Sequence, residues 1–104
     1  MSGTGGYAVI WRKDDGPVVP GVLLLAGDAV RLRGGIRGHP VEHAFPYRSL
    51  SDVRLTHSAA ERVQGLPSLL IEVCRLDRFL VAAIGGIGVI TELADLIAAA
   101  RPLA

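Results

Sequence analysis

Apolar and polar residues alternate with a period of two through most of the chain as far as Ile84. In the stretch YAVIWRK, for example, Tyr7, Val9 and Trp11 fall on one face of an extended strand. The stretch SDVRLTH alternates in the same way. This pattern is typical of strands with one buried face, so the sequence predicts a series of short antiparallel strands.

Turn signals divide this alternating region. GVLLLAG and AVRLRG flank Gly27-Asp28, which indicates a two-residue hairpin because glycine readily adopts the positive φ of such turns. GGIRGHP has the composition of a loop, and in the following VEHAFPYRSL the alternation places His43 on the core side. SLLIEVC and RFLVAAI form a further predicted hairpin with Leu76-Asp77 near its turn, and SAAERVQGLP is a polar connection.

Beyond Ile84 the period of the apolar residues changes from that of a strand to that of a helix. The residues that recur at helical spacing are Ile90, Leu93, Ala94, Ile97 and Ala98. They predict a C-terminal helix that docks one apolar stripe on the strands.

A glycine-rich turn precedes this helix and superficially resembles a dinucleotide-binding loop. Gly86 and Gly88 match the first two glycines of G-x-G-x-x-G, but the third position is Thr91. We therefore interpret the turn as the point where the chain reverses from the last strand into the helix, and we expect no cofactor.

The order of elements resembles the pleckstrin-homology (PH) superfold, especially its small bacterial and GRAM-like members. GVLLLAGDAVRLRG is similar to the family's second and third strands, and FPYRSLSDVRL to its Y-x-x-I-x-x-V step, here with Leu50 and Val53. The resemblance covers residues 7–101 and implies a mainly β (α+β) fold. The expected architecture is an antiparallel PH-like β-barrel or roll of about seven strands, capped by one C-terminal α-helix. Residues 1–6 are expected to form a disordered tail and residues 7–104 a single domain.

The stretch RLRGGIRGH supplies the candidate binding residues. Arg31 and Arg33 share a strand face, and Arg37 and His39 follow on the same hairpin. Cations at this spacing suit a phosphate-rich head group or an acidic peptide, whereas the alternative is a solvated strand face. Lipid-binding PH domains carry a K-x(n)-[KR]-x-R pattern. Lys13 with Arg31 and Arg33 resembles it, except that the gap is longer and the loop between contains the acidic KDDGP.

HPVEH matches the H-x-x-E-H pattern of some zinc proteases through His39, Glu42 and His43. That pattern binds zinc on a helix, but the prolines at positions 40 and 46 leave little room for one. On a strand the two histidines would stand about 13 Å apart. A zinc hydrolase is therefore kept only as a remote alternative, and no metal site is expected.

Composition excludes several further classes of function. The net charge of +1 and the scarcity of aromatic residues (two Phe, two Tyr, one Trp) argue against nucleic-acid binding. The longest apolar run, Phe79 to Ile90, is too short for a transmembrane segment, and the first residues lack the pattern of a signal peptide. The single cysteine, Cys74, is expected to be a small buried or half-buried thiol in a reducing cytoplasm. The excess of Ala, Gly, Val and Arg suggests a GC-rich bacterial genome.

The sequence thus favours a non-enzymatic, cytoplasmic interaction module. We expect it to bind a protein segment at a sheet edge or in a groove between strand and helix, or to self-associate. The alternative is a peripheral binder of anionic lipid head groups through Arg31, Arg33 and Arg37.

Overall fold

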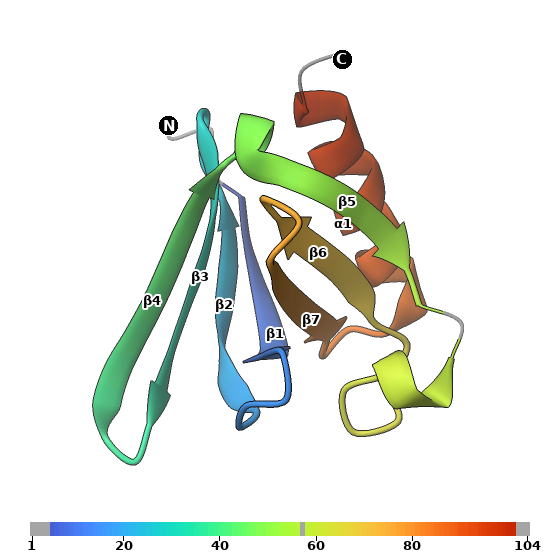
Figure 1. Ribbon diagram of the computed structural model, residues 1–104. Helices are drawn as coiled ribbons and strands as arrows, with labels where there is room; N and C mark the ends of the chain where they lie inside the picture. Colours follow the sequence, from blue (N-terminus) through green and yellow to red (C-terminus); the bar gives the residue numbers. More distant parts are fainter. Residues whose placement is uncertain (1–4, 57, 102–104) are drawn as a thin grey trace.

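The computed structural model (Figure 1) describes residues 5–56 and 58–101. Outside the described residues lie residues 1–4, residue 57 and residues 102–104. The first of these ranges is the outer part of the expected N-terminal tail. The elements in chain order are β1 (Gly5–Lys13), β2 (Val19–Leu25), β3 (Ala29–Ile36), β4 (His39–Pro46), the 3-10 helix η1 (Tyr47–Ser49), β5 (Leu50–Leu55), the 3-10 helix η2 (Ala59–Glu61), β6 (Leu69–Val73), β7 (Asp77–Ala83) and the α-helix α1 (Ile87–Ala100).

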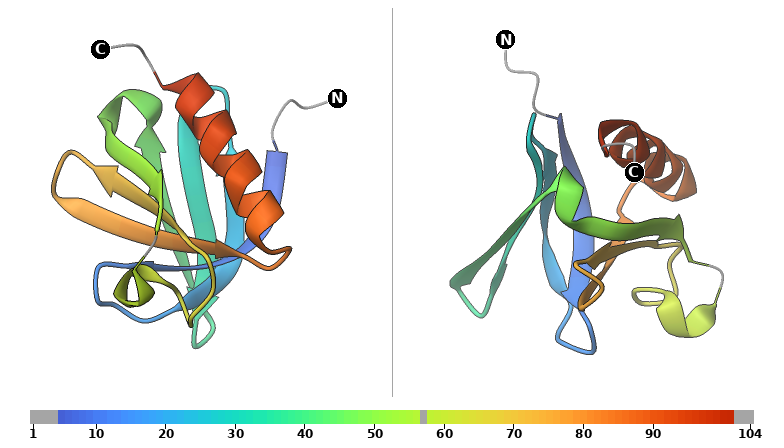
Figure 2. Two further views of the ribbon diagram at one scale, coloured as in Figure 1. Left: turned by 90° about the vertical axis from the view of Figure 1, so that its right-hand side faces the viewer. Right: turned by 45° about the horizontal axis from the view of Figure 1, so that its top comes forward.

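The strands form one antiparallel sheet with the order β4-β3-β2-β1-β7-β6-β5. Strand β1 pairs with β2 on one side and with β7 on the other, which joins the start of the sheet to its end. The sheet curls into a half-barrel, with β4 and β5 as its two edges and α1 lying across one opening (Figures 1 and 2). The predicted fold class is therefore confirmed: a mainly β, antiparallel seven-stranded half-barrel with one C-terminal helix.

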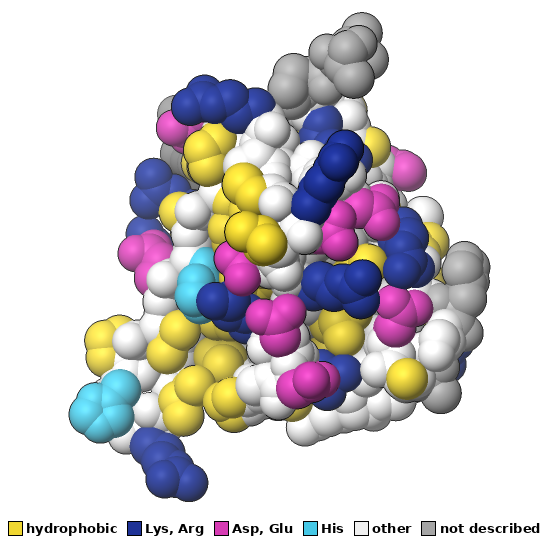
Figure 3. Space-filling model, in the orientation of Figure 1, with side chains coloured by type: hydrophobic (Ala, Val, Ile, Leu, Met, Phe, Trp, Pro, Cys, Tyr) yellow, Lys and Arg dark blue, Asp and Glu magenta, His cyan; other side chains and the backbone are white. Residues whose placement is uncertain are grey.

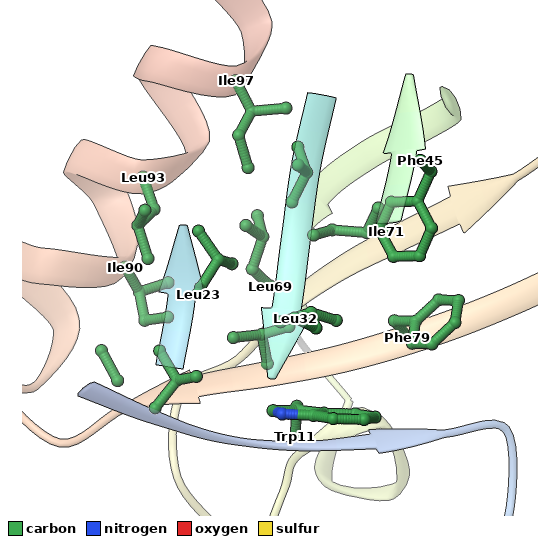
Figure 4. Packing of buried hydrophobic residues seen from close by; sticks show 14 of the residues in the cluster. Trp11, Leu23, Leu32, Phe45, Leu69, Ile71, Phe79, Ile90, Leu93 and Ile97 are labelled. Carbon is green, nitrogen blue, oxygen red and sulfur yellow. The ribbon is translucent and has the colours of Figure 1, made fainter. Parts of the chain in front are cut away.

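The main core fills the concave side of the sheet. From the helix, Ile90, Leu93 and Ile97 are fully buried and point toward sheet residues such as Leu23 and Leu69 (Figure 4). The predicted apolar stripe is thus confirmed at these positions, whereas the last residue predicted for it, at position 98, is exposed. The alternation in β1 is confirmed as well, because its inward-facing residues at positions 9 and 11 are buried.

A second apolar cluster lies on the other face of β6 and β7. Its buried members are Val63, Leu70, Leu80 and Ala82. The segment that precedes β6 supplies Val63, whose N–H donates to the Ser68 hydroxyl at 2.9 Å. The stretch SAAERVQGLP is therefore more than the polar connection predicted from its composition, because its valine is a core residue.

Glycine allows β2 and β3 to approach closely beside the indole of Trp11. A Cβ atom added to Gly21 would lie 1.8 Å from the carbonyl oxygen of Arg33, so only glycine fits there. The Trp11 indole N–H donates to the same oxygen at 3.3 Å. This contact fixes the ring in the floor of the half-barrel.

The turns differ from the predictions in detail. Gly27-Asp28 does form the two-residue turn between β2 and β3, with the Ala26 N–H donating to the Ala29 carbonyl at 3.0 Å, but Gly27 does not adopt a positive φ. The expected loop GGIRGHP is mostly strand, and β3 and β4 are joined by two residues of positive φ, Arg37 and Gly38.

Two further boundaries are corrected. Strand β1 already begins at Gly5, and Gly6 pairs with Leu24 of β2. The expected tail therefore does not reach residue 6. The turn between β6 and β7 consists of residues 74–76, so the predicted turn near Leu76-Asp77 is confirmed, but it already begins at Cys74, which the sequence placed in the strand. Cys74 and Arg75 both adopt a positive φ. The Cys74 thiol is consequently exposed, so its predicted burial is wrong.

Candidate functional site: a pocket between two hairpins

A pocket of about 220 Å³ opens between the β1–β2 and β3–β4 hairpins. We call it the hairpin pocket. It is lined by Trp11, Lys13, Gly16, Pro17, Val19, Ile36, Val41 and His43. On this face of the molecule, hydrophobic side chains gather between the projecting β3–β4 hairpin and the centre (Figure 3). All the lining residues belong to β1–β4 and the β1–β2 turn, so the pocket lies in a part of the half-barrel that these two hairpins enclose.

Aromatic rings form the inner wall of the hairpin pocket. The His43 ring packs edge-on against Trp11, with ring centres 5.4 Å apart, and against Phe79 at 5.1 Å. The prediction that His43 faces the core side is therefore confirmed. Burial lowers the pKa of His43, the charge of Lys13 lowers it further, and Asp77 acts in the opposite direction. The imidazole is consequently mainly neutral at pH 7 and contributes to an apolar wall.

The charges beside the hairpin pocket largely compensate one another. The Lys13 Nζ lies 3.7 Å from a carboxylate oxygen of Asp77, and both side chains are about half exposed. Such an exposed pair is a weak interaction that salt screens. The pocket therefore offers mainly apolar contact, with one solvated ion pair nearby.

The four candidate residues from the sequence occupy two places on the β3–β4 hairpin. Arg31 and Arg33 share the convex face of β3, opposite the buried Leu32, as expected. Arg33 is paired with Glu42 on β4, with Nε and Oε2 2.5 Å apart. Arg37 and His39 are exposed at the hairpin turn, beyond or opposite Ile36, which lies about 10 Å along the strand from Arg33.

The structure therefore places Arg31 and Arg33 together on one face of β3, whereas Arg37 lies at the tip of the β3–β4 hairpin. The turn residues lie close in sequence to Ile36, which lines the hairpin pocket. The two convex-face arginines are on the side of the sheet away from it, since the inward-facing residues of β3 line the core.

The stretch HPVEH lies in β4 and has no helical geometry. His39 is exposed at the start of the strand, whereas His43 packs in the aromatic wall of the hairpin pocket. Among residues 5–56 and 58–101, no group of three or more His, Cys, Asp or Glu side chains is placed to hold a metal ion. The zinc alternative requires a helix that places His39 and His43 on one face, and this stretch forms a strand instead.

The glycine-rich turn acts as a chain reversal, as interpreted from the sequence. Gly86 adopts a φ of 96° directly before α1, a conformation that side chains rarely tolerate. Its N–H donates to the Ala83 carbonyl at 3.2 Å, which closes the turn after β7.

The two sheet edges differ in how far they are covered. At β5, the Arg101 guanidinium donates to the Leu50 carbonyl at 2.9 Å, and α1 packs along the strand. Along β4, no described strand pairs with the outward edge. Edge β4 therefore presents backbone groups beside His43 and the hairpin pocket. Alternation predicted this strand, and the sequence signal for its place at an edge is the pair of prolines at positions 40 and 46.

Comparisons with known proteins support the architecture. No protein-family model matches the chain, and no curated protein sequence matches it significantly. Among solved structures, the crystal structure of the C-terminal domain of an unknown protein from Leishmania infantum is similar, with a TM-score of 0.67 and 9% sequence identity over 90% of this chain and 82% of that chain. At such low identity the likeness concerns the fold alone.

In the part of the chain that the structure describes, no helix is long and apolar enough to cross a membrane.

Proposed function

We propose that the chain is a non-enzymatic, PH-like interaction module that binds an extended segment of a partner protein. One apolar side chain of that segment would occupy the hairpin pocket. The observation that carries this proposal is the pocket itself, an apolar cavity beside a sheet edge with no described strand on its outer side.

The size and lining of the pocket support a side chain as the occupant. Its volume of about 220 Å³ is below the roughly 300–1,000 Å³ of typical small-molecule sites. Its aromatic and aliphatic walls resemble the well-packed pockets that receive anchor residues at protein interfaces. The indole of Trp11 is already fixed by its hydrogen bond to the Arg33 carbonyl, so little ordering is needed on binding.

The arrangement of charges favours a protein segment over an anionic head group. Lys13 is paired with Asp77 and Arg33 with Glu42, which reduces the net positive charge at both places. Arg37 stands apart at the hairpin turn. A head-group site requires cations that converge on one phosphate.

A display library of random ten-residue peptides tests the proposal. We expect the protein to enrich peptides that share one apolar residue. The selected peptides should bind Ile36→Ser about tenfold more weakly, because the variant loses apolar contact in the pocket. Val22→Ser is the matched control: Val22 is an apolar strand residue, 38% exposed on the convex face, and its loss should leave affinity unchanged.

Two results would overturn the proposal. The first is a library without enriched peptides, or peptides that bind Ile36→Ser as well as the wild type. The second is salt-sensitive sedimentation with anionic vesicles that disappears when Arg31, Arg33 and Arg37 are all changed to Ala. That result would instead support the head-group alternative.

A further inference from the structure

The outward edge of β4 has a defined pattern of backbone groups. Alternate residues of an antiparallel strand direct both N–H and C=O toward the same neighbour. Tyr47, which follows β4, donates its N–H to the Asp28 carbonyl at 3.4 Å, in line with the pairing of Pro46 with Ala29. The odd-numbered residues of β4 therefore bond to β3, and the even-numbered residues face outward.

Prolines restrict which outward groups can donate. The outward positions 40 and 46 are prolines, which have no N–H and occur in strands at free edges for this reason. Among the described residues of β4, Glu42 and Ala44 alone present both an N–H and a C=O on the outward side, and both are exposed. The edge thus offers a short pairing site with a proline at each end.

We propose that the partner segment adds to β4 as an antiparallel strand in a single register. This inference rests on the proposed function and specifies how the segment binds. Two residues of the segment would exchange hydrogen bonds with Glu42 and Ala44, and the residue between them would lie opposite His43. Such a pair without mutual hydrogen bonds has its Cα atoms about 4.5 Å apart and its side chains on one face. The middle residue would therefore direct its apolar side chain over His43 toward the hairpin pocket.

The register also defines the chemistry of the segment. The middle residue is apolar, because its neighbours are the neutral His43 ring and Val41. The two flanking residues lie on the convex face, where one stands opposite Glu42. A basic or neutral polar residue is favoured there, since like charges directly opposite one another destabilise a strand pair.

A second copy of this chain fits the same edge poorly. Pairing Glu42 with Ala44 of the second copy would set Pro40 against Pro46, with no donor on either strand, and His43 against the second His43. The edge therefore suits a different protein segment with an apolar anchor.

The substitution Ala44→Pro tests the inference on the tightest peptide selected from the library. It removes an outward N–H and leaves the bonds between β3 and β4 intact. We expect at least a tenfold loss of affinity for Ala44→Pro and less than a threefold loss for Ala44→Thr, which keeps the N–H. Wild-type Trp11 emission and thermal unfolding would show that both variants are folded.

N-methylation of the peptide provides a second measurement that leaves the protein unchanged. Methyl groups placed singly along the peptide backbone should abolish binding at the two positions that pair with Glu42 and Ala44, and be tolerated at the position between them. Equal tolerance at all positions would overturn the inference. If Ile36→Ser weakens binding while Ala44→Pro and the methylated peptides do not, the pocket is used without strand addition. If none of the changes weakens binding, the proposed function fails as well.

Discussion

His43 joins the hairpin pocket to the aromatic core, because its ring packs against both Trp11 and Phe79. Burial lowers the pKa of His43 below its ordinary value of 6.5, and Lys13 lowers it further. As the pH falls, the unfolded chain therefore takes up a proton at His43 at a higher pH than the folded chain does. The part of the folding stability that depends on neutral His43 is fully present above pH 6.5. It is lost as the pH falls below that value toward the lower pKa of His43 in the folded state.

We predict that His43→Phe reduces the loss of stability between pH 7.5 and pH 5.5. The measurement is urea unfolding at both pH values, followed by Trp11 emission. His39→Gln is the matched control, because His39 is exposed at the hairpin turn and should retain the wild-type difference. A His43→Phe variant with the full wild-type difference would show that other groups cause it.

At the scale of elements, the β6–β7 turn contains a conformation that its residues disfavour. Arg75 adopts a φ of 59°, which costs an L-residue about 1–2 kcal/mol. We predict that Arg75→Gly stabilises the protein by about 0.5–1 kcal/mol, because relief of this strain exceeds the greater entropy of glycine in the unfolded chain. The Arg75 N–H donates to the Ser51 hydroxyl at 2.9 Å, and glycine keeps this bond.

The midpoint of urea unfolding measures this effect. Gly38→Ala should shift the midpoint in the opposite direction, because Gly38 has a φ of 82° in the turn between β3 and β4. An unchanged or lower midpoint for Arg75→Gly would show that the arginine side chain contributes more than the strain costs.

The elements that sequence could predict are those with local signals. The helix was predicted because Ile90, Leu93 and Ile97 repeat at helical spacing, and this spacing depends on no distant residue. The β6–β7 turn was predicted near Leu76-Asp77, where it lies, but the positive φ of Cys74 and Arg75 was not, because these residues lack the turn preferences of glycine, asparagine and aspartate. Their conformation follows from the pairing of the two strands around them.

The candidate site was less accessible to sequence reasoning. Alternation predicted that His43 faces inward, but it did not show that Trp11 and Val19 meet Ile36 and Val41 across two hairpins. That meeting depends on the curvature of the sheet. The arginines on β3 were conspicuous in the sequence because charged residues stand out in an apolar chain, whereas the salt bridge between Arg33 and Glu42 required the register of β3 against β4.

At the scale of the whole molecule, both faces of one sheet carry buried clusters. Strand β7 contributes Val81 to the main core and Leu80 to the second cluster, and it also pairs with β1. Loss of either cluster would therefore disturb a strand that the other cluster needs. This shared use of β7 indicates a single cooperative unfolding transition.

We predict that Leu93→Ala lowers the stability of the helix and of the sheet together. Leu93 is fully buried, so its truncation should cost about 2–5 kcal/mol. Leu96→Ala, on the same helix but 42% exposed, is the matched control and should cost about 1 kcal/mol or less.

Circular dichroism reports on α1, and the emission of Trp11 reports on the far side of the core (Figure 4). The two transitions should coincide in urea and move by the same amount in Leu93→Ala. If the dichroism transition moved while the Trp11 transition stayed in place, α1 would unfold separately, and the half-barrel would be stable without its helix.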